Sequence, residues 1–190
     1  MNKRKNIISM KETMKNIGVP EETIALINFP DTSRNPEPEE IITLINDIDE
    51  FLTEEQRILV MQEQGCCKSG IGPKAHQAFG QEHAGKTIDD KVTLLNKTKM
   101  PHKAPCRLNG DGTLSVYWSF GEKGEYKCVC GIVKKLPEKK VPLTFCGCCG
   151  GHICNNYKKS LGVNLRLKKI VSSAASSGGK EHCEFLFEIY

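Results

Sequence analysis

Thr144-Phe-Cys-Gly-Cys-Cys-Gly-Gly-His152 is the stretch around which we expect the rest of the chain to be organised, and Tyr126-Lys-Cys-Val-Cys130 comes shortly before it. Together the two segments bring five thiols and one imidazole into 27 residues, a density that no other region of the sequence approaches. Thiolates and imidazoles are the ligands preferred by zinc, cuprous copper and iron–sulfur clusters, and tetrahedral zinc takes four of them. The pattern predicts a metal site, with zinc preferred over an iron–sulfur cluster, and its candidate ligands are Cys128, Cys130, Cys146, Cys148, Cys149 and His152.

The spacing within each segment suits such a site. Alternate residues of a strand point to the same face, so Cys128 and Cys130 on an expected strand could reach one centre. The thiols of the second segment are expected in a flexible turn, because three glycines between residues 147 and 151 would let the backbone wrap closely around an ion. His152 is expected at the start of a helix, three residues after Cys149.

The remaining thiols divide into a pair and three single residues. Cys66-Cys67 directly follows Gly65 at the end of an expected helix, and it is a candidate third contributor to the metal site or a reactive pair. Cys106, Cys154 and Cys183 each stand alone, and a small buried hydrophobic residue is the preferred interpretation of each.

A thiol enzyme is the alternative interpretation of the cluster. His152 beside Cys148 and Cys149 could serve as the base for a cysteine nucleophile, and amides at the expected helix start could hold an oxyanion. A zinc ion with three protein ligands could instead activate water. The sequence contains no phosphate-binding loop, dinucleotide fingerprint, nucleophile elbow or zinc-protease motif.

The composition limits the class of protein. Of the 190 residues, 38% are hydrophobic and 26% are charged, as in ordinary globular domains. A net charge of +4, scattered lysines and few aromatic residues do not favour binding to nucleic acid. No apolar signal core follows the first residues, and no apolar run approaches the ~20 residues of a membrane span. We therefore expect a cytoplasmic protein that binds neither nucleic acid nor membrane, whose cysteines are metal ligands or reactive thiols.

Helix signals dominate residues 1–100. Pro20-Glu-Glu-Thr-Ile-Ala-Leu-Ile-Asn28 and Pro38-Glu-Glu-Ile-Ile-Thr-Leu-Ile-Asn46 form a weak repeat, in which proline and acids suit a helix start and an apolar stripe follows. Thr53-Glu-Glu-Gln56 is a capping box, and Thr87-Ile-Asp-Asp90 is another N-cap. Further helices are expected over residues 5–17 and within residues 70–85.

Strand signals follow Pro101 and Pro105, which forbid regular helix and mark an expected hinge at residues 97–109. Alternating apolar residues predict one hairpin from 113–120 and 126–133 and another from 165–175 and 182–190, with a helix near 151–160 between them. The predicted fold is α+β. A helical subdomain, residues 1–100, packs on a small antiparallel sheet of two hairpins that carries the cysteine-rich site, residues 101–190.

The order of the motifs resembles known families. Gly65-Cys66-Cys67, Tyr126-Lys-Cys-Val-Cys130, Phe145-Cys-Gly-Cys-Cys149 and Val171-Ser-Ser…Gly178-Gly-Lys-Glu-His-Cys183-Glu-Phe185 are similar to motifs of uncharacterised bacterial proteins related to the 4-vinyl reductase domain. The chain also resembles the family named for L-2-amino-thiazoline-4-carboxylic acid hydrolase. The resemblance implies helices packed on an antiparallel sheet, a small-molecule or metal pocket between them, and dimerisation through helices. It also implies metal ligands at Cys66, Cys128, Cys130, Cys146 and Cys149.

One further possibility is an interaction subunit that dimerises through its helices, with the apolar stripe from Ile41 to Ile48 as interface instead of core. Beside it, two functional expectations result. The first is a metal-binding domain, with zinc as the metal, that binds or senses a small molecule and forms a homodimer; Cys66 and Cys67 join the six candidate ligands named above. The second is a thiol- or zinc-dependent hydrolase that acts on a small heterocyclic or sulfur-containing substrate.

Overall fold

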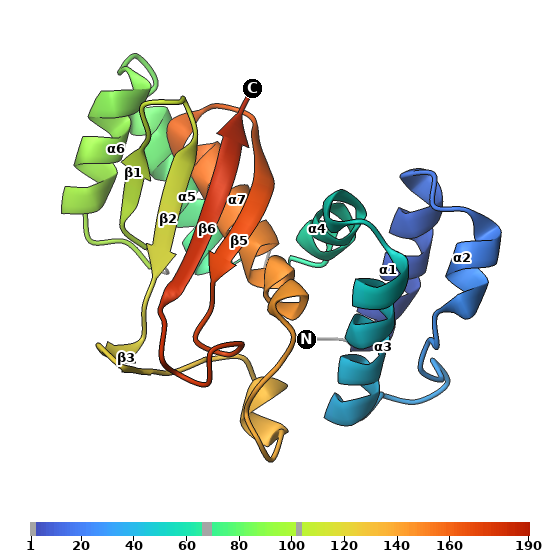
Figure 1. Cartoon of the computed structure of the whole chain (residues 1–190). Coiled ribbons are helices and arrows are strands. Elements are labelled where there is room, and N and C mark those ends of the chain that lie inside the picture. Colours follow the sequence, from blue (N-terminus) through green and yellow to red (C-terminus); the bar gives the residue numbers. More distant parts are fainter. Residues whose placement is uncertain (1–2, 66–69, 102–103) are drawn as a thin grey trace.

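A four-stranded antiparallel sheet is the frame of the second half of the chain (Figure 1). The computed structural model describes residues 3–65, 70–101 and 104–190. The sheet has the order β1-β2-β6-β5, so it consists of two hairpins, β1–β2 and β5–β6, joined through β2 and β6. The strands are β1 (Cys106–Leu108), β2 (Leu114–Trp118), β5 (Leu165–Ser172) and β6 (Cys183–Ile189).

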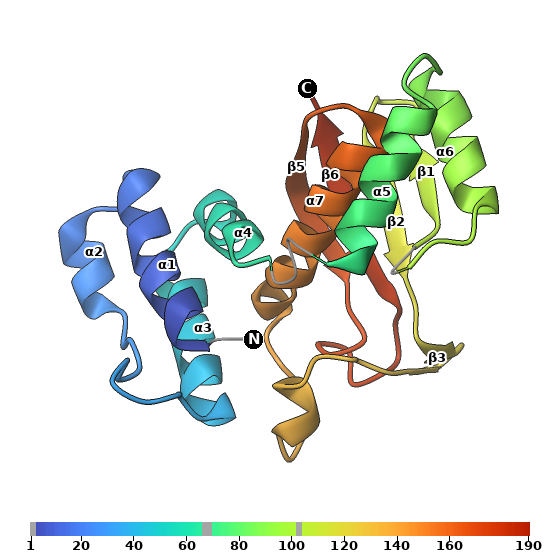
Figure 2. The same ribbon diagram turned by 180° about the vertical axis from the view of Figure 1, so that it is seen from behind.

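Three helices cover one face of this sheet, as the two opposite views show (Figures 1 and 2). They are α5 (Ile71–Glu82), α6 (Ile88–Lys97) and α7 (Gly147–Leu161). Apolar side chains alternate with polar ones along the strands, and the apolar ones, such as Leu167, Phe185 and Phe187, are buried on the covered face. On the opposite face of the sheet, Arg166 of β5 and Glu188 of β6 form an ion pair at 2.6 Å.

The first four helices pack together beside the sheet (Figure 1). They are α1 (Lys3–Asn16), α2 (Glu21–Leu26), α3 (Pro38–Phe51) and α4 (Glu54–Glu63). The predicted apolar stripe of α3 is core, since Ile41, Leu44, Ile45 and Ile48 are all buried. Helix α4 joins this group to the sheet because the Leu167 N–H of β5 donates a hydrogen bond to Gln62 Oε1 at 2.6 Å. The predicted α+β fold with a helical first half is confirmed.

Two helices, α4 and α6, begin at the capping residues that the sequence predicts. The Gln56 N–H donates to Thr53 Oγ1, and the Thr53 N–H donates to Gln56 Oε1, so the capping box before α4 is confirmed. Helix α6 begins after Thr87, whose Oγ1 accepts a hydrogen bond from the Asp90 N–H. Each cap satisfies an amide that a helix start leaves without a partner.

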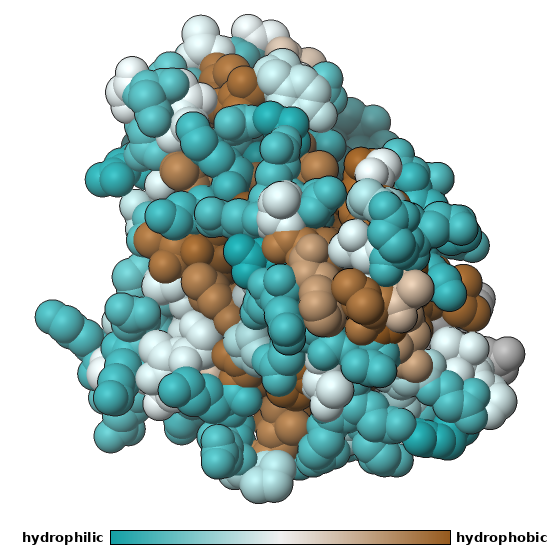
Figure 3. Space-filling model, turned by 45° about the vertical axis from the view of Figure 1, so that its right-hand side comes forward, coloured by the Kyte–Doolittle hydropathy of each residue, from teal (hydrophilic) through white to brown (hydrophobic). Residues whose placement is uncertain are grey.

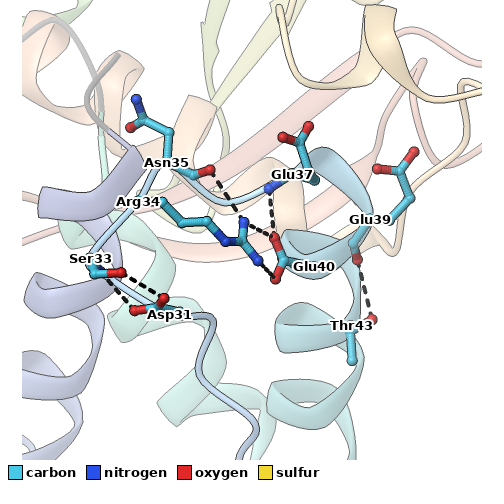
Figure 4. Close-up of polar contacts among 8 residues, drawn as sticks. All are labelled: Asp31, Ser33, Arg34, Asn35, Glu37, Glu39, Glu40 and Thr43. Atoms are coloured by element: carbon cyan, nitrogen blue, oxygen red, sulfur yellow. Dashed lines mark hydrogen bonds and ion pairs between the residues drawn. The ribbon is translucent and has the colours of Figure 1, made fainter.

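The loop between α2 and α3 is ordered by its own polar side chains (Figure 4). The Arg34 guanidinium binds both carboxylate oxygens of Glu40, at 2.6 and 2.7 Å, and the Glu37 N–H also donates to Glu40. Asp31 accepts hydrogen bonds from the N–H and the hydroxyl of Ser33. The hydrogen bond from Arg34 holds the pKa of the Glu40 carboxyl below its ordinary value.

The first predicted hairpin needs correction. Strand β2 pairs with β1 and β6, not with residues 126–133, and β1 lies within the stretch predicted as a hinge. Residues 121–126 form a separate ribbon of β3 (Gly121–Glu122) and β4 (Glu125–Tyr126), and residues 127–131 have no regular structure. Pairing with β1 and β6 places Leu114 and Val116 of β2 in the buried face of the sheet, whereas residues 127–131 are only exposed or half-buried and offer no such face.

The glycine-rich turn predicted around Cys148 is also corrected, because it is the first turn of α7. This helix begins at Gly147, directly after the short 3-10 helix η2 (Leu143–Cys146). A Cβ atom on Gly151 would lie 1.9 Å from the Gln62 carbonyl oxygen of α4, and one on Gly150 would lie 2.6 Å from Leu167 of β5. Glycine is therefore required for close packing, and the tertiary contacts outweigh its low helix propensity.

The surface mixes polar and apolar side chains. On the face drawn in Figure 3, hydrophobic residues occur in separate patches among hydrophilic ones. Phe120 and Val129, from the segment that follows β2, are among the large apolar side chains with substantial exposure. Within the part of the chain that the structure describes, no helix is both long enough and apolar enough to cross a membrane.

Candidate functional site

Cysteines from distant parts of the sequence line one cavity of about 450 Å³, here called the cysteine cavity. It forms where the end of β2, the start of β6 and the start of α7 lie at the same end of the sheet, next to the β3 ribbon (Figure 1). A loop after β4, the junction of η2 with α7, and the first residue of β6 each contribute sulfur. Among the described residues, the lining thiols are Cys128, Cys130, Cys146, Cys148, Cys149 and Cys183.

Apolar side chains form most of the remaining wall. The antiparallel register places Trp118 of β2 directly opposite Cys183 of β6, and the Trp118 ring stacks on His152 of α7. Phe185 also lines the cavity, and Phe120 approaches Trp118 with a ring-centroid separation of 5.5 Å. Ile132 closes the cavity from the loop side. The sulfurs therefore lie in surroundings of low polarity.

Backbone amides point at two of the sulfur atoms. The Cys130 N–H donates to Cys128 Sγ at 3.5 Å, and the Ala174 N–H donates to Cys183 Sγ at 3.4 Å. A hydrogen bond received by sulfur favours its thiolate form. The Cys146 thiol instead donates to the hydroxyl oxygen of Ser173 at 3.1 Å. These contacts fix the positions of sulfurs on three sides of the cavity.

Burial makes the metal-free thiols weak acids. It raises the pKa of Cys128 to about 11, with smaller contributions from the neighbouring Cys149, Cys130 and Cys183. Burial and the proximity of Cys149 raise the pKa of Cys146 well above its ordinary value. The pKa of Cys149 is raised as well, first by its hydrogen bond with Cys148 and then by burial. Because ionised sulfurs would repel one another here, thiolates in this cavity need a cation among them.

His152 is not among the described residues that line the cavity, but it contacts one that does. Its ring, 5% exposed, stacks on Trp118 with centroids 5.7 Å apart and an angle of 11° between the planes. The amide nitrogen of Asn156 lies 3.3 Å from His152 Nε2, so the two side chains form a buried hydrogen bond one helical turn apart. Trp118 lines the cavity and His152 supports it from one face.

The predicted thiols that the structure describes line the same cavity, but they do not surround a common metal position. Over residues 3–65, 70–101 and 104–190, no three His, Cys, Asp or Glu side chains converge tightly enough to hold a metal in this conformation. The donor set itself fits a soft metal, since it is rich in sulfur and two of the sulfurs receive amide hydrogen bonds. Cys66 and Cys67, predicted as possible ligands, lie outside the described residues.

One prediction about local structure at this site is wrong, and one lining residue was missed. Cys128 and Cys130 lie in an irregular loop and not on a strand, yet both line the cavity. Cys183, predicted as a small buried hydrophobic residue, also lines it. The signal for Cys183 was present in the sequence, as a thiol that begins a strand directly after a glycine turn.

The comparisons with known proteins provide no identification. No protein-family model matches the chain, and no curated protein or solved structure is significantly similar to it. The resemblance to 4-vinyl reductase domains and to the thiazoline hydrolase family therefore stays a prediction.

Proposed function

We propose that this protein is a cytoplasmic, metal-binding domain that binds or senses a small molecule, and that its thiolates hold a soft metal ion, with zinc as the first candidate. The observation that carries the proposal is the gathering of thiols from three separate segments around one apolar cavity. Thiols distributed by chance over a sequence would not be expected to share one wall.

A metal ion would resolve the electrostatic problem of this cavity. Burial keeps the pKa values of Cys128 and Cys146 high, and the hydrogen bond with Cys148 together with burial does the same for Cys149, but a dication stabilises the thiolate form of its ligands. All six lining thiols are candidate ligands, because they lie close enough for charges within the group to contribute to the raised pKa values of Cys128, Cys146, Cys149 and Cys183. The cavity volume leaves room for a small molecule beside the ion, since ligand pockets are typically about 300–1,000 Å³.

A sensing role is supported by a link from the cavity to the first helices. Cys148 and Ile132 line the cysteine cavity and also a narrow space of about 30 Å³ that Met10 of α1 and Leu44 of α3 help to line. A change in the position of Cys148 or Ile132 would therefore act directly on the packing of α1 and α3.

Metal analysis of protein purified without oxygen tests the proposal. We expect about one zinc ion per chain, loss of metal in the double variant Cys128→Ser/Cys149→Ser, and a lower melting temperature after chelation. Cys154→Ser is the matched control, because this buried thiol donates to the Leu165 carbonyl away from the cavity and should leave the metal content unchanged. Less than about 0.2 metal ion per chain would refute metal binding, since structural zinc binds tightly.

The hydrolase alternative is tested by the reactivity of the thiols. A cysteine nucleophile needs a low pKa, whereas burial raises the pKa of Cys128 and Cys146. Rapid labelling of a single cysteine by iodoacetamide at neutral pH would favour the hydrolase. Protection of the cavity thiols until a chelator is added would favour metal coordination.

The homodimer implied by the resemblance remains part of the proposal. Because the α3 stripe is buried within the chain, such a dimer would need another helix face. Light scattering of the full chain distinguishes a monomer from a dimer.

A further inference from the structure

The charged residues of the cysteine cavity all have one sign. Lys127 and Lys135 line it, and no aspartate or glutamate among the described residues does so. Both lysines are exposed, so their ammonium groups lie at the rim while the apolar and sulfur-bearing wall lies deeper. The cavity thus has an apolar interior with a cationic edge.

Neither of these two cations lies within ion-pair distance of a carboxylate among the described residues. Within residues 104–190 and the other described parts of the chain, neither Lys127 nor Lys135 forms an ion pair, unlike Lys15, Arg34 and Arg166. Cationic groups beside an apolar cavity raise the local concentration of anions and select ligands whose charge lies at the rim.

The aromatic residues define the other end of the ligand. Trp118 and Phe120 are adjacent in the wall, and Trp118 is supported from one face by the stacked ring of His152. A rigid, supported aromatic surface favours flat apolar ring systems, because they gain contact area with little loss of conformational freedom. Phe120 is 37% exposed and Val129 47% exposed, so a ligand would also cover apolar surface that now faces solvent.

We infer that the small molecule of this cavity is an amphipathic aromatic anion, such as an aryl carboxylate or sulfonate, whose ring packs on Trp118 and Phe120 and whose anionic group pairs with Lys127 and Lys135. This inference rests on the proposed function, in that it names the ligand class of the same cavity. It does not depend on which sulfurs hold a metal.

The single tryptophan of the chain gives a direct test. Because Trp118 lines the cavity, energy transfer from it to a bound naphthalene reports binding at this place. The probes are 1-anilinonaphthalene-8-sulfonate and N-phenyl-1-naphthylamine, which share a ring system and differ in the sulfonate. We expect tighter binding of the sulfonate probe, and an affinity for it that falls as salt is raised.

Lysine substitutions separate charge from shape. The double variant Lys127→Gln/Lys135→Gln should bind the sulfonate probe about tenfold more weakly, since each exposed pair contributes up to about fivefold, and it should bind the neutral probe as before. Lys134→Gln is the matched control, because Lys134 is exposed beside Lys135 but does not line the cavity. Val129→Asp, which adds an acid at an exposed rim position, should weaken the sulfonate probe more than the neutral probe, because the neutral probe loses only apolar contact there.

The outcomes distinguish the two levels of the proposal. If both probes transfer energy from Trp118 with equal affinities that the lysine variants do not change, the anionic ligand class is refuted and the cavity remains a small-molecule site. If neither probe receives energy from Trp118, binding of small molecules fails as well, and with it that part of the proposed function.

Discussion

Replacing Gly151 by alanine should separate two helices that the fold requires in contact. A Cβ atom at this position would lie 1.9 Å from the Gln62 carbonyl oxygen and 2.8 Å from the Gln62 carbonyl carbon. Ordinary contact begins near 3.4 Å, so α4 and α7 would have to move apart by about 1.5 Å. Both atoms belong to the helical backbone of α4, and no rotation of a side chain can relieve the overlap.

The cost can be worked out from this overlap. Forcing an additional carbon into a packed interface costs typically 1–3 kcal/mol, and the better helix propensity of alanine returns about 0.5–1 kcal/mol. Separation of the helices also strains the part-buried hydrogen bond from the Leu167 N–H to Gln62 Oε1, and the weakening of this bond adds about 1 kcal/mol to the cost. We expect a net loss of about 2 kcal/mol, or about 4–8 °C in melting temperature for a chain of this size.

Thermal unfolding followed by circular dichroism measures this loss. Gly85→Ala is the matched control, since a Cβ atom there would have no neighbour within 4 Å, and its effect should stay within about 0.5 kcal/mol. If Gly151→Ala melts within about one degree of the unchanged protein, the close approach of α4 to α7 is wrong, and the argument for the glycines of α7 fails with it.

Three further predictions concern the caps, a buried lysine and the thiols. Thr53→Ala removes the capping box of α4 and should cost about 1 kcal/mol by chemical denaturation, whereas Thr43→Ala, on an exposed helix face, should cost less. Lys91→Met removes the buried hydrogen bond, 2.8 Å long, from Lys91 Nζ to the Leu161 carbonyl at the end of α7. A cation there also interacts favourably with the carbonyl end of the helix, so the loss should cost about 1–2 kcal/mol, and a change below about 0.3 kcal/mol would show that this lysine does not stabilise α7. Because the pKa of Cys128 is raised to about 11 in the folded, metal-free protein and is about 8.5 in the unfolded chain, stability should be constant below about pH 8.5 and fall as the pH approaches 11. Cys128→Ser should lessen that fall in melting temperature, and an unchanged profile would show that this thiol does not carry it.

Local signals predict the helices of this protein well, because a cap or an apolar stripe is contained in a few neighbouring residues. The Thr53 capping box, the Thr87 cap and the buried stripe of α3 are all confirmed. The β5–β6 hairpin is confirmed for the same reason, since a glycine turn joins two adjacent alternating segments. Such features are decided before the chain makes any distant contact.

The errors occur where distant contacts decide the structure. The partner of β2 is β6, more than sixty residues later, and no local pattern distinguishes it from the nearer segment 126–133. Likewise, glycines read alone predict a turn at 147–151, but α4 and β5 press against them and only a helix without Cβ atoms fits there. The thiols were recognised from their density, whereas the inclusion of Cys183 in the cavity depends on the register of β6.

The first turn of α7 joins the stability of the fold to the chemistry of the cavity. Its glycines, Gly150 and Gly151, face β5 and α4, while Cys148 and Cys149 from the same turn line the cavity. Any movement of α4 or β5 against the glycines must therefore shift these two thiols, because a helical turn moves as a unit. The dense run of glycine and cysteine in the sequence then has a single physical explanation. Glycine brings the turn close to two other elements, and this approach places its thiols opposite those of the loop after β4 and of β6.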